Sequence, residues 1–308
     1  MSTSAGADRS TSDNAHPVIV GIDGSDSSCH AARWAAGLAH ALRVPLHLVH
    51  SVVTVGSYLS DAAVIAIKAA TAADQYTAEA AEKILTATVE AVHHEFPELS
   101  VTTEVAAEPA DTALIQQSRQ ARFVVLGCED ISRAAALLLG STSLAVTTRA
   151  RCPVVAWRGI AAPTTAPVVV GVDGTPAGTA ALAAAFAFAD QFGARVKAVH
   201  AWSTTMPADY ATLPYLIDWE AAEREQHAVL ASAVRPWAER FPGVEVEFFL
   251  DPVKPSRALL DRLEDAQLVV VGTHRTNALT AAILGSTTLN MLHHSAVPVL
   301  VCHAADAS

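Results

Sequence analysis

The sequence predicts an α/β fold of two tandem domains, each a doubly wound parallel sheet of five strands. The first observation behind this prediction is a repeat: PVIVGIDGS at 17–25 returns as PVVVGVDGT at 167–175, and further blocks recur in the same order. The second is an alternation of short β-branched runs with longer alanine-rich stretches, which is typical of strands connected by helices. Ordered blocks of this kind indicate a duplicated domain rather than a short-period solenoid.

The expected strands of the first half are short and mostly apolar on both faces, as in a parallel sheet covered by helices on both sides. They are VIVGI at 18–22, LHLVH at 46–50, VTTEV at 101–105, FVVLG at 123–127 and VVAW at 154–157. Helices are expected at 25–42, 61–95, 110–120 and 141–150. Because this alternation with right-handed crossovers gives a doubly wound sheet, a ligand is expected at the carboxyl ends of the strands.

The repeat also predicts where the domains begin and end. Residues 1–15 are small and polar, without the apolar stretch of a signal peptide, and are expected to form a flexible tail. The first domain is expected at 16–158 and the second at 167–304. Between them, residues 159–166 contain proline and small polar side chains and are expected to act as a linker.

Composition narrows the class of function. The chain has 20 Lys and Arg against 31 Asp and Glu, a formal net charge of −11. A nucleic-acid partner is therefore not expected, because phosphate binding needs a basic face. No uncharged apolar run reaches the ~20 residues that a membrane span needs, so no membrane partner is expected. The four cysteines form neither a CxxC pair nor a Cys/His metal spacing, which predicts no metal site and a cytoplasmic location.

The first candidate for a binding site is an acidic tripeptide just after the first strand of each half. The tripeptides are Asp23-Gly24-Ser25 and Asp173-Gly174-Thr175. A carboxylate in this place can reach a ribose hydroxyl or an adenine edge, while the glycine permits a tight turn. The alternative is an ordinary Asp-Gly turn whose Ser or Thr caps the next helix, and the tripeptide alone favours that alternative.

The second candidate is a pair of glycines near the end of each half. Gly127 and Gly272 each end a strand, and thirteen residues later Gly140-Ser141 and Gly285-Ser286 each open a helix. A helix N-terminus offers free N–H groups, and glycine lets a phosphate approach the backbone. Further hydroxyl contacts to phosphate are expected from Ser141, Ser143, Ser286 and Thr288. The alternative is that each Gly-Ser only begins a helix, since duplication copies packing as readily as binding.

Both halves resemble the universal stress protein family, from about residue 17 to 303. The resemblance is carried by GIDGS, LVHS, VVLG…LLLGSTS and RCPVVAW, then by GVDGT, AVHA, VVVG…AILGSTT and AVPVLVC. It implies an adenine nucleotide alpha hydrolase-like fold and an ATP held by the strand-end Asp, the residue after the second-strand His, and the phosphate loop. By position these residues are Asp23, Ser51, Gly127, Gly140 and Ser141, then Asp173, Ala201, Gly272, Gly285 and Ser286.

The resemblance also implies a biological role. Tandem proteins of this type are familiar in actinobacteria, and the family is associated with the response to stress. The chain is accordingly expected to be a sensor or carrier of ATP or another adenine nucleotide and not an enzyme. The last strands of such proteins commonly pair across a dimer interface, which implies that this chain can form a homo-oligomer.

The sequence departs from the family's G-x-x-G-x9-G-[ST] pattern in both halves. Its middle glycine is replaced by Asp130 in the first half and by Arg275 in the second. The carboxylates of Glu129 and Asp130 would repel a triphosphate unless Mg²⁺ bridged them, whereas Arg275 can pair with phosphate. If only one half binds ATP, we therefore expect it to be the second.

Two other functions stay open on the sequence alone. The replacement of both middle glycines favours an interaction scaffold that holds no nucleotide. A slow ATPase is the other alternative. Against it, the sequence contains no HExxH, no GxSxG and no P-loop, and no residue is an evident general base with a positioned partner.

Overall fold

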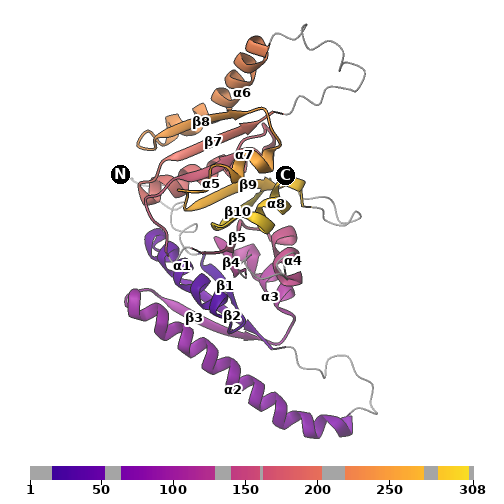
Figure 1. Cartoon of the computed structure of the whole chain (residues 1–308). Coiled ribbons are helices and arrows are strands. Elements are labelled where there is room, and N and C mark those ends of the chain that lie inside the picture. The colour runs from indigo at the N-terminus through magenta and orange to yellow at the C-terminus, as the bar shows by residue number, and fades with distance from the viewer. Residues whose placement is uncertain are drawn as a thin grey trace, which may run out of the picture. The chain divides into compact units, whose positions relative to one another are not determined.

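The structure is a computed structural model. It describes residues 16–52, 64–128, 140–159, 162–202, 219–273 and 284–304. The described residues form two compact units (Figure 1). The chain passes from the first of them, unit 1, to the second, unit 2, between Ala162 and Pro163. The finer domain limits expected from the sequence stay a prediction.

Unit 1 contains a parallel sheet of five strands in the order β3-β2-β1-β4-β5. The strands are β1 (Val18–Ile22), β2 (Leu46–Ser51), β3 (Val101–Ala106), β4 (Phe123–Gly127) and β5 (Val154–Trp157). The helices are α1 (Asp26–Leu42), α2 (Val64–Glu95), α3 (Ala110–Gln117) and α4 (Ser141–Arg149), with a short 3₁₀ turn at Ser118–Gln120. Helices α1 and α2 pack together on one face, and α3 and α4 pack together on the other (Figure 1).

Unit 2 repeats this arrangement, with the strand order β8-β7-β6-β9-β10. Its strands are β6 (Val168–Gly171), β7 (Val196–Ala201), β8 (Val246–Asp251), β9 (Leu268–Thr273) and β10 (Val299–His303). Its helices are α5 (Pro176–Phe192), α6 (Trp219–Arg240), α7 (Pro255–Leu260) and α8 (Ser286–His294). The predicted fold class is confirmed. In each unit the strand order reverses beside the first strand, which is the switch point where ligands of such sheets bind.

The centre of each sheet is a layer of β-branched side chains that is shielded on both faces. Val20 and Val125 in unit 1, and Val170 and Val270 in unit 2, are fully buried. The alanine-rich faces of α1 and α5 pack directly on these strands, because small side chains let the helix backbone come close. This close packing fixes the start of each helix next to the carboxyl ends of the strands.

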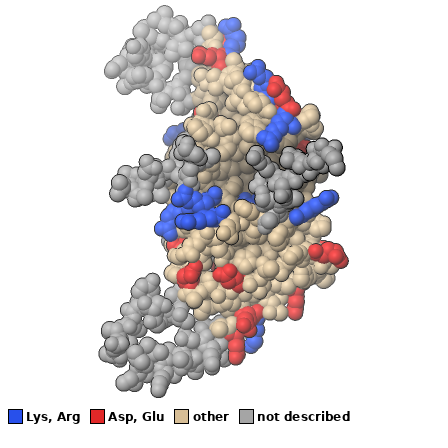
Figure 2. Space-filling model, turned by 180° about the vertical axis from the view of Figure 1, so that it is seen from behind, with Lys and Arg blue, Asp and Glu red and all other residues tan. Residues whose placement is uncertain are grey.

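The face of the molecule in Figure 2 carries charges of both signs. Its Lys and Arg side chains lie in separated groups, between broad areas that carry neither charge. Exposed ion pairs such as Arg257–Asp261, at 2.8 Å, bring opposite charges together at the surface of unit 2. The described residues in this view therefore form no continuous basic surface of the kind that nucleic-acid binding requires. No helix in the described part of the chain is both long enough and apolar enough to span a membrane.

Helices α1 and α5 end in the same way but with different residues. Arg43 follows α1 with a φ of 56°, and Gly193 follows α5 with a φ of 62°. In both, the backbone N–H of this left-handed residue bonds back to a carbonyl of the last helical turn. Glycine adopts such a φ freely, whereas a side chain meets its own carbonyl there.

Arg43→Gly is expected to raise the free energy of unfolding by about 0.5–1 kcal/mol, because it removes this steric cost at the C-cap. The reverse change in unit 2, Gly193→Arg, should lower the same free energy by about 1 kcal/mol. Urea unfolding followed by circular dichroism measures both. Unchanged midpoints in the two variants would show that the left-handed residue carries no strain.

Candidate functional site

The acidic tripeptide after the first strand forms the same turn in both units. In unit 1, Asp23 Oδ1 accepts hydrogen bonds from the Ser25 N–H at 2.9 Å and from the Ser25 hydroxyl at 2.6 Å. In unit 2, Asp173 Oδ1 accepts from the Thr175 N–H at 3.0 Å and from its hydroxyl at 2.7 Å. The turn holds each carboxylate, exposed to solvent, at the carboxyl edge of its sheet.

Positive φ angles account for the glycines of these turns. Gly24 has a φ of 84° and Gly174 a φ of 72°, values that a side chain rarely adopts. The following hydroxyls are helix caps: the Ser25 hydroxyl accepts the Ser28 N–H at 3.1 Å, and the Thr175 hydroxyl accepts the Gly178 N–H at 3.0 Å. The turn thus accounts for the glycines, and the helix caps account for Ser25 and Thr175. Neither the turn nor the cap uses the second oxygen of the carboxylates.

The Asp23 carboxyl is held in its ionised form. Burial acts to raise its pKa, but hydrogen bonds from the Ser25 hydroxyl, the Ser25 N–H and Ser28 outweigh burial and lower the pKa below its usual value. A carboxylate that stays ionised at neutral pH can accept hydrogen bonds from the hydroxyls of a ligand.

Gly127 and Gly272, the first glycines of the expected phosphate loops, are required by packing. A methyl group on Gly127 would lie 2.6 Å from the carbonyl carbon and oxygen of Ser27, in the first turn of α1. A methyl group on Gly272 would overlap the Ala177 carbonyl, in the first turn of α5. The start of the first helix of each unit therefore touches the neighbouring strand backbone to backbone, which only glycine allows.

Gly140 and Gly285, at the N-termini of α4 and α8, have no such requirement. Their φ angles are −54° and −56°, and a methyl group on either would meet no described atom within 4 Å. No side chain within the described residues caps either helix. Ser141 and Ser286, the residues that follow, are exposed. These N-termini present free N–H groups at an open surface, which is the arrangement that binds an anion.

The end of the second strand is tied to the first strand by histidine. His50 Nδ1 donates to the Ile22 carbonyl at 2.7 Å, and His200 Nδ1 donates to the Val172 carbonyl at the same distance. The next residue differs between the units: the Ser51 hydroxyl donates to the Glu108 carbonyl, and Ala201 has no hydroxyl. The histidines thus position the strand ends around the carboxylate.

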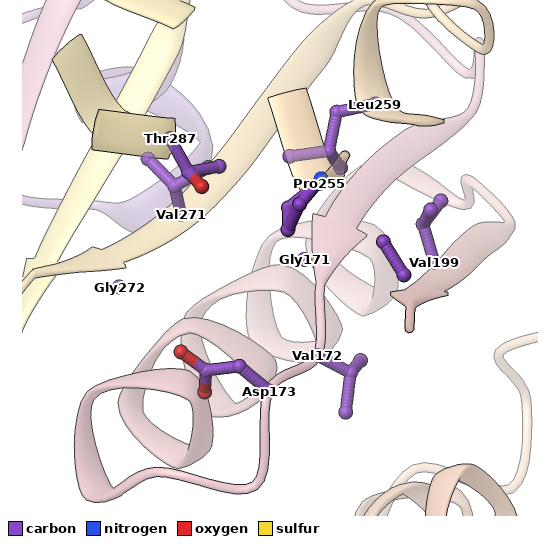
Figure 3. Close-up of a pocket in the computed structure, with 10 residues that line it drawn as sticks. Gly171, Val172, Asp173, Val199, Pro255, Leu259, Val271, Gly272 and Thr287 are labelled. Atoms are coloured by element: carbon purple, nitrogen blue, oxygen red, sulfur yellow. The ribbon is translucent and has the colours of Figure 1, made fainter. Parts of the chain in front are cut away.

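Unit 2 has a partly open cavity of about 130 Å³ at this edge of its sheet (Figure 3). It is lined by Gly171, Val172, Asp173, Val199, Ala201, Pro255, Leu259, Val271, Gly272 and Thr287. The structure thus brings together three residues expected from the sequence: Asp173, Ala201 and Gly272. The remaining walls are mostly aliphatic. In Figure 3 the side chains of Asp173 and Val172 leave the chain in opposite directions just after β6.

Two hydroxyls expected to contact phosphate interact with groups of the protein itself, next to the last helix of each unit. Thr288 is 1% exposed, and its hydroxyl donates to the Gly272 carbonyl at 3.1 Å. Ser143, at the equivalent place in unit 1, hydrogen-bonds the Cys128 thiol. In unit 2 the neighbouring Thr287 lines the cavity. Adjacent helical residues point about 100° apart, so a shift of one residue exchanges the packing role and the lining role.

Other parts of the expected site lie outside the described residues. These are Glu129 and Asp130 in the first half, and His274 and Arg275 in the second. The aliphatic lining residues, and Pro255, which begins α7, were not expected from the sequence. A signal for most of them was present, because they lie towards the carboxyl end of a strand or, for Pro255, at the start of the helix that follows. Leu259, near the end of α7, carries no such signal.

The comparisons with known proteins agree over the length of both units. The model of the universal stress protein family matches residues 14–158 and 165–303. A universal stress protein of Mycobacterium tuberculosis is 36% identical, over 93% of this chain and 96% of that protein. Another, of Mycolicibacterium smegmatis, is 32% identical over 92% and 96%. The crystal structure of a universal stress protein from Archaeoglobus fulgidus shares the fold, with a TM-score of 0.63 and 20% identity over 94% of this chain and 98% of that chain.

Gly272→Ala is expected to lower the free energy of unfolding by about 1–3 kcal/mol, because the added methyl overlaps backbone that cannot move without shifting α5. Gly285→Ala is the matched control and should change it by no more than about 0.5 kcal/mol, since its φ suits alanine and the space is open. Chemical denaturation compares the two. Equal losses would mean that Gly285 is also a packing residue.

Proposed function

The chain belongs to the universal stress protein family, and we propose that it binds an adenine nucleotide, ATP in the first place, and acts as its sensor or carrier in a stress response. The observation that carries the proposal is the cavity of unit 2. An aliphatic hollow there opens beside the Asp173 carboxylate, at the switch point of a parallel sheet.

The size and lining of the cavity suit a single flat ring system. An apolar cavity of roughly 150 Å³ in another protein binds one benzene ring, and the cavity of unit 2, of about 130 Å³, is close to that size. Val172, Val199 and Leu259 offer aliphatic surface to the faces of a ring. One ring of the adenine base would enter this space, and the rest of the base, the ribose and the phosphates would extend out of it.

The polar groups around the cavity suit the rest of a nucleotide. Asp173 Oδ1 is occupied by Thr175, while within the described residues no hydrogen bond reaches Oδ2, which can accept the ribose hydroxyls. The N-terminus of α8, with Gly285 and Ser286, would hold phosphate through its free N–H groups. Glycine is needed there by neither φ nor neighbouring atoms, so close approach of a ligand gives it a purpose.

The lining of the cavity also supports a role in binding rather than in catalysis. Asp173 is the one ionisable side chain among the described residues that line it. General acid–base chemistry needs a second titratable group or a positioned partner, and the lining offers neither. A nucleotide held in this way would stay intact. The cytoplasmic location expected from the cysteines and the homo-oligomer expected from the family stay predictions.

Titration of ATP into the purified full-length protein, followed by calorimetry, tests the proposal. Asp173→Asn is expected to weaken binding roughly tenfold or more, because it removes a charge-assisted hydrogen bond to ribose. Asp190→Asn, an exposed carboxylate on α5 that does not line the cavity, is the control and should bind ATP as the parent does.

The fate of the nucleotide separates the alternatives. Chromatography of the mixture after prolonged incubation should recover ATP unchanged. No binding to the parent protein would favour the interaction scaffold that holds no nucleotide. Steady formation of ADP, lost in Asp173→Asn, would instead favour the slow ATPase.

A further inference from the structure

Unit 1 and unit 2 differ in the side chains that surround the strand-end carboxylate. Of the ten residues that line the cavity of unit 2, six have the same residue type at the equivalent position of unit 1. The four exchanges are Ile22 for Val172, Ser51 for Ala201, Ala110 for Pro255 and Leu126 for Val271. In three of the four, unit 1 has the larger side chain.

The exchange of Leu126 for Val271 has a direct steric effect. In unit 1 a methyl group on Gly21 would lie 2.8 Å from Leu126 Cδ2 and 3.0 Å from Leu114 Cδ1. In unit 2 the equivalent methyl group, on Gly171, would have Leu259 Cδ1 as its nearest described neighbour, at 3.5 Å. Unit 1 therefore fills with Leu126 the space that unit 2 leaves open beside its first strand.

A second difference lies under the carboxylate, at the third residue of the first helix. In unit 2 this residue is Gly178, and a methyl group on it would overlap Asp173 Oδ1. The Asp173 carboxylate thus occupies the space over Gly178. In unit 1 the same position is Ser28, which is 3% exposed and whose hydroxyl lies 2.9 Å from the Ser25 carbonyl and 3.4 Å from the Asp23 N–H. Asp23 keeps its two hydrogen bonds to Ser25 beside this serine, so the carboxylate of unit 1 has a side chain next to it where the carboxylate of unit 2 lies over bare backbone.

We propose that the nucleotide site is open in unit 2 and closed in unit 1, with Val271 and Gly178 as the residues that keep it open. The inference rests on the proposed function and adds to it the location and the number of the sites. Val271 keeps room for the base, and Gly178 lets the carboxylate lie flat against the start of α5. In unit 1 Leu126 takes the room for the base, and the Ser28 side chain takes the space beside the carboxylate. The chain accordingly binds one nucleotide, not two.

Reciprocal exchanges test this inference, with ATP as the ligand and calorimetry of the full-length protein as the readout. The parent is expected to bind about one ATP per chain, because Leu126 takes the space for the base in unit 1. Val271→Leu and Gly178→Ala should each weaken binding roughly fivefold or more, because each added group takes space from base or carboxylate. The double variant Ser28→Gly with Leu126→Val should gain a second site, so that the stoichiometry rises to about two.

Stability measurements keep these outcomes interpretable. Gly178→Ala puts a better helix former into the first turn of α5, and unit 1 keeps the same turn with the Ser28 side chain at this position. Its unfolding midpoint should therefore stay level or rise while its affinity falls, which loss of folding would not produce. Gly243→Ala, where a methyl group meets no described atom within 4 Å, is the matched control and should change neither quantity.

Three results would overturn the inference while leaving the proposed function in place. They are two sites of equal affinity in the parent, unchanged affinity in both Val271→Leu and Gly178→Ala, and a double variant that folds but gains no site. A parent that binds no ATP at all would remove the proposed function, and this inference with it.

Discussion

The contact between the first helix of each unit and the neighbouring strand is the constraint on which the site depends. The first turns of α1 and α5 lie against Gly127 and Gly272 backbone to backbone, with no room for a side chain between them. This contact fixes where the helix begins. Because the strand-end Asp caps the turn that leads into the helix, the same contact fixes the carboxylate at the switch point of the sheet.

Much of the fold follows from the sequence for physical reasons. A parallel strand buried on both faces must be apolar throughout, and a helix packed closely on it must be rich in small residues. The alternation of the two can therefore be recognised in the sequence. The repeat doubles each of these signals. The two Asp-Gly turns could also be predicted from the sequence, because the φ angles of Gly24 and Gly174 strongly favour glycine.

The residues of the candidate site were harder to predict from the sequence, because their roles depend on which side of a helix or strand each side chain faces. The sequence does not distinguish a glycine that allows close approach of a phosphate from one that allows close approach of a helix. Gly127 allows close approach of α1. The exchange of roles between Thr287 and Thr288 is a matter of one helical position. The aliphatic walls of the cavity, such as Leu259, look like any other core residue until the strands are placed side by side.

The hydroxyl of Ser25 or Thr175 is used twice, since it donates to the carboxylate and accepts from the helix backbone. Asp, Asn and Gly can also begin a helix, yet only a hydroxyl does both with one atom. Mutational tolerance at this position should therefore be narrower than at an ordinary helix start. The two copies of the domain have diverged widely and still differ here by a single methyl group.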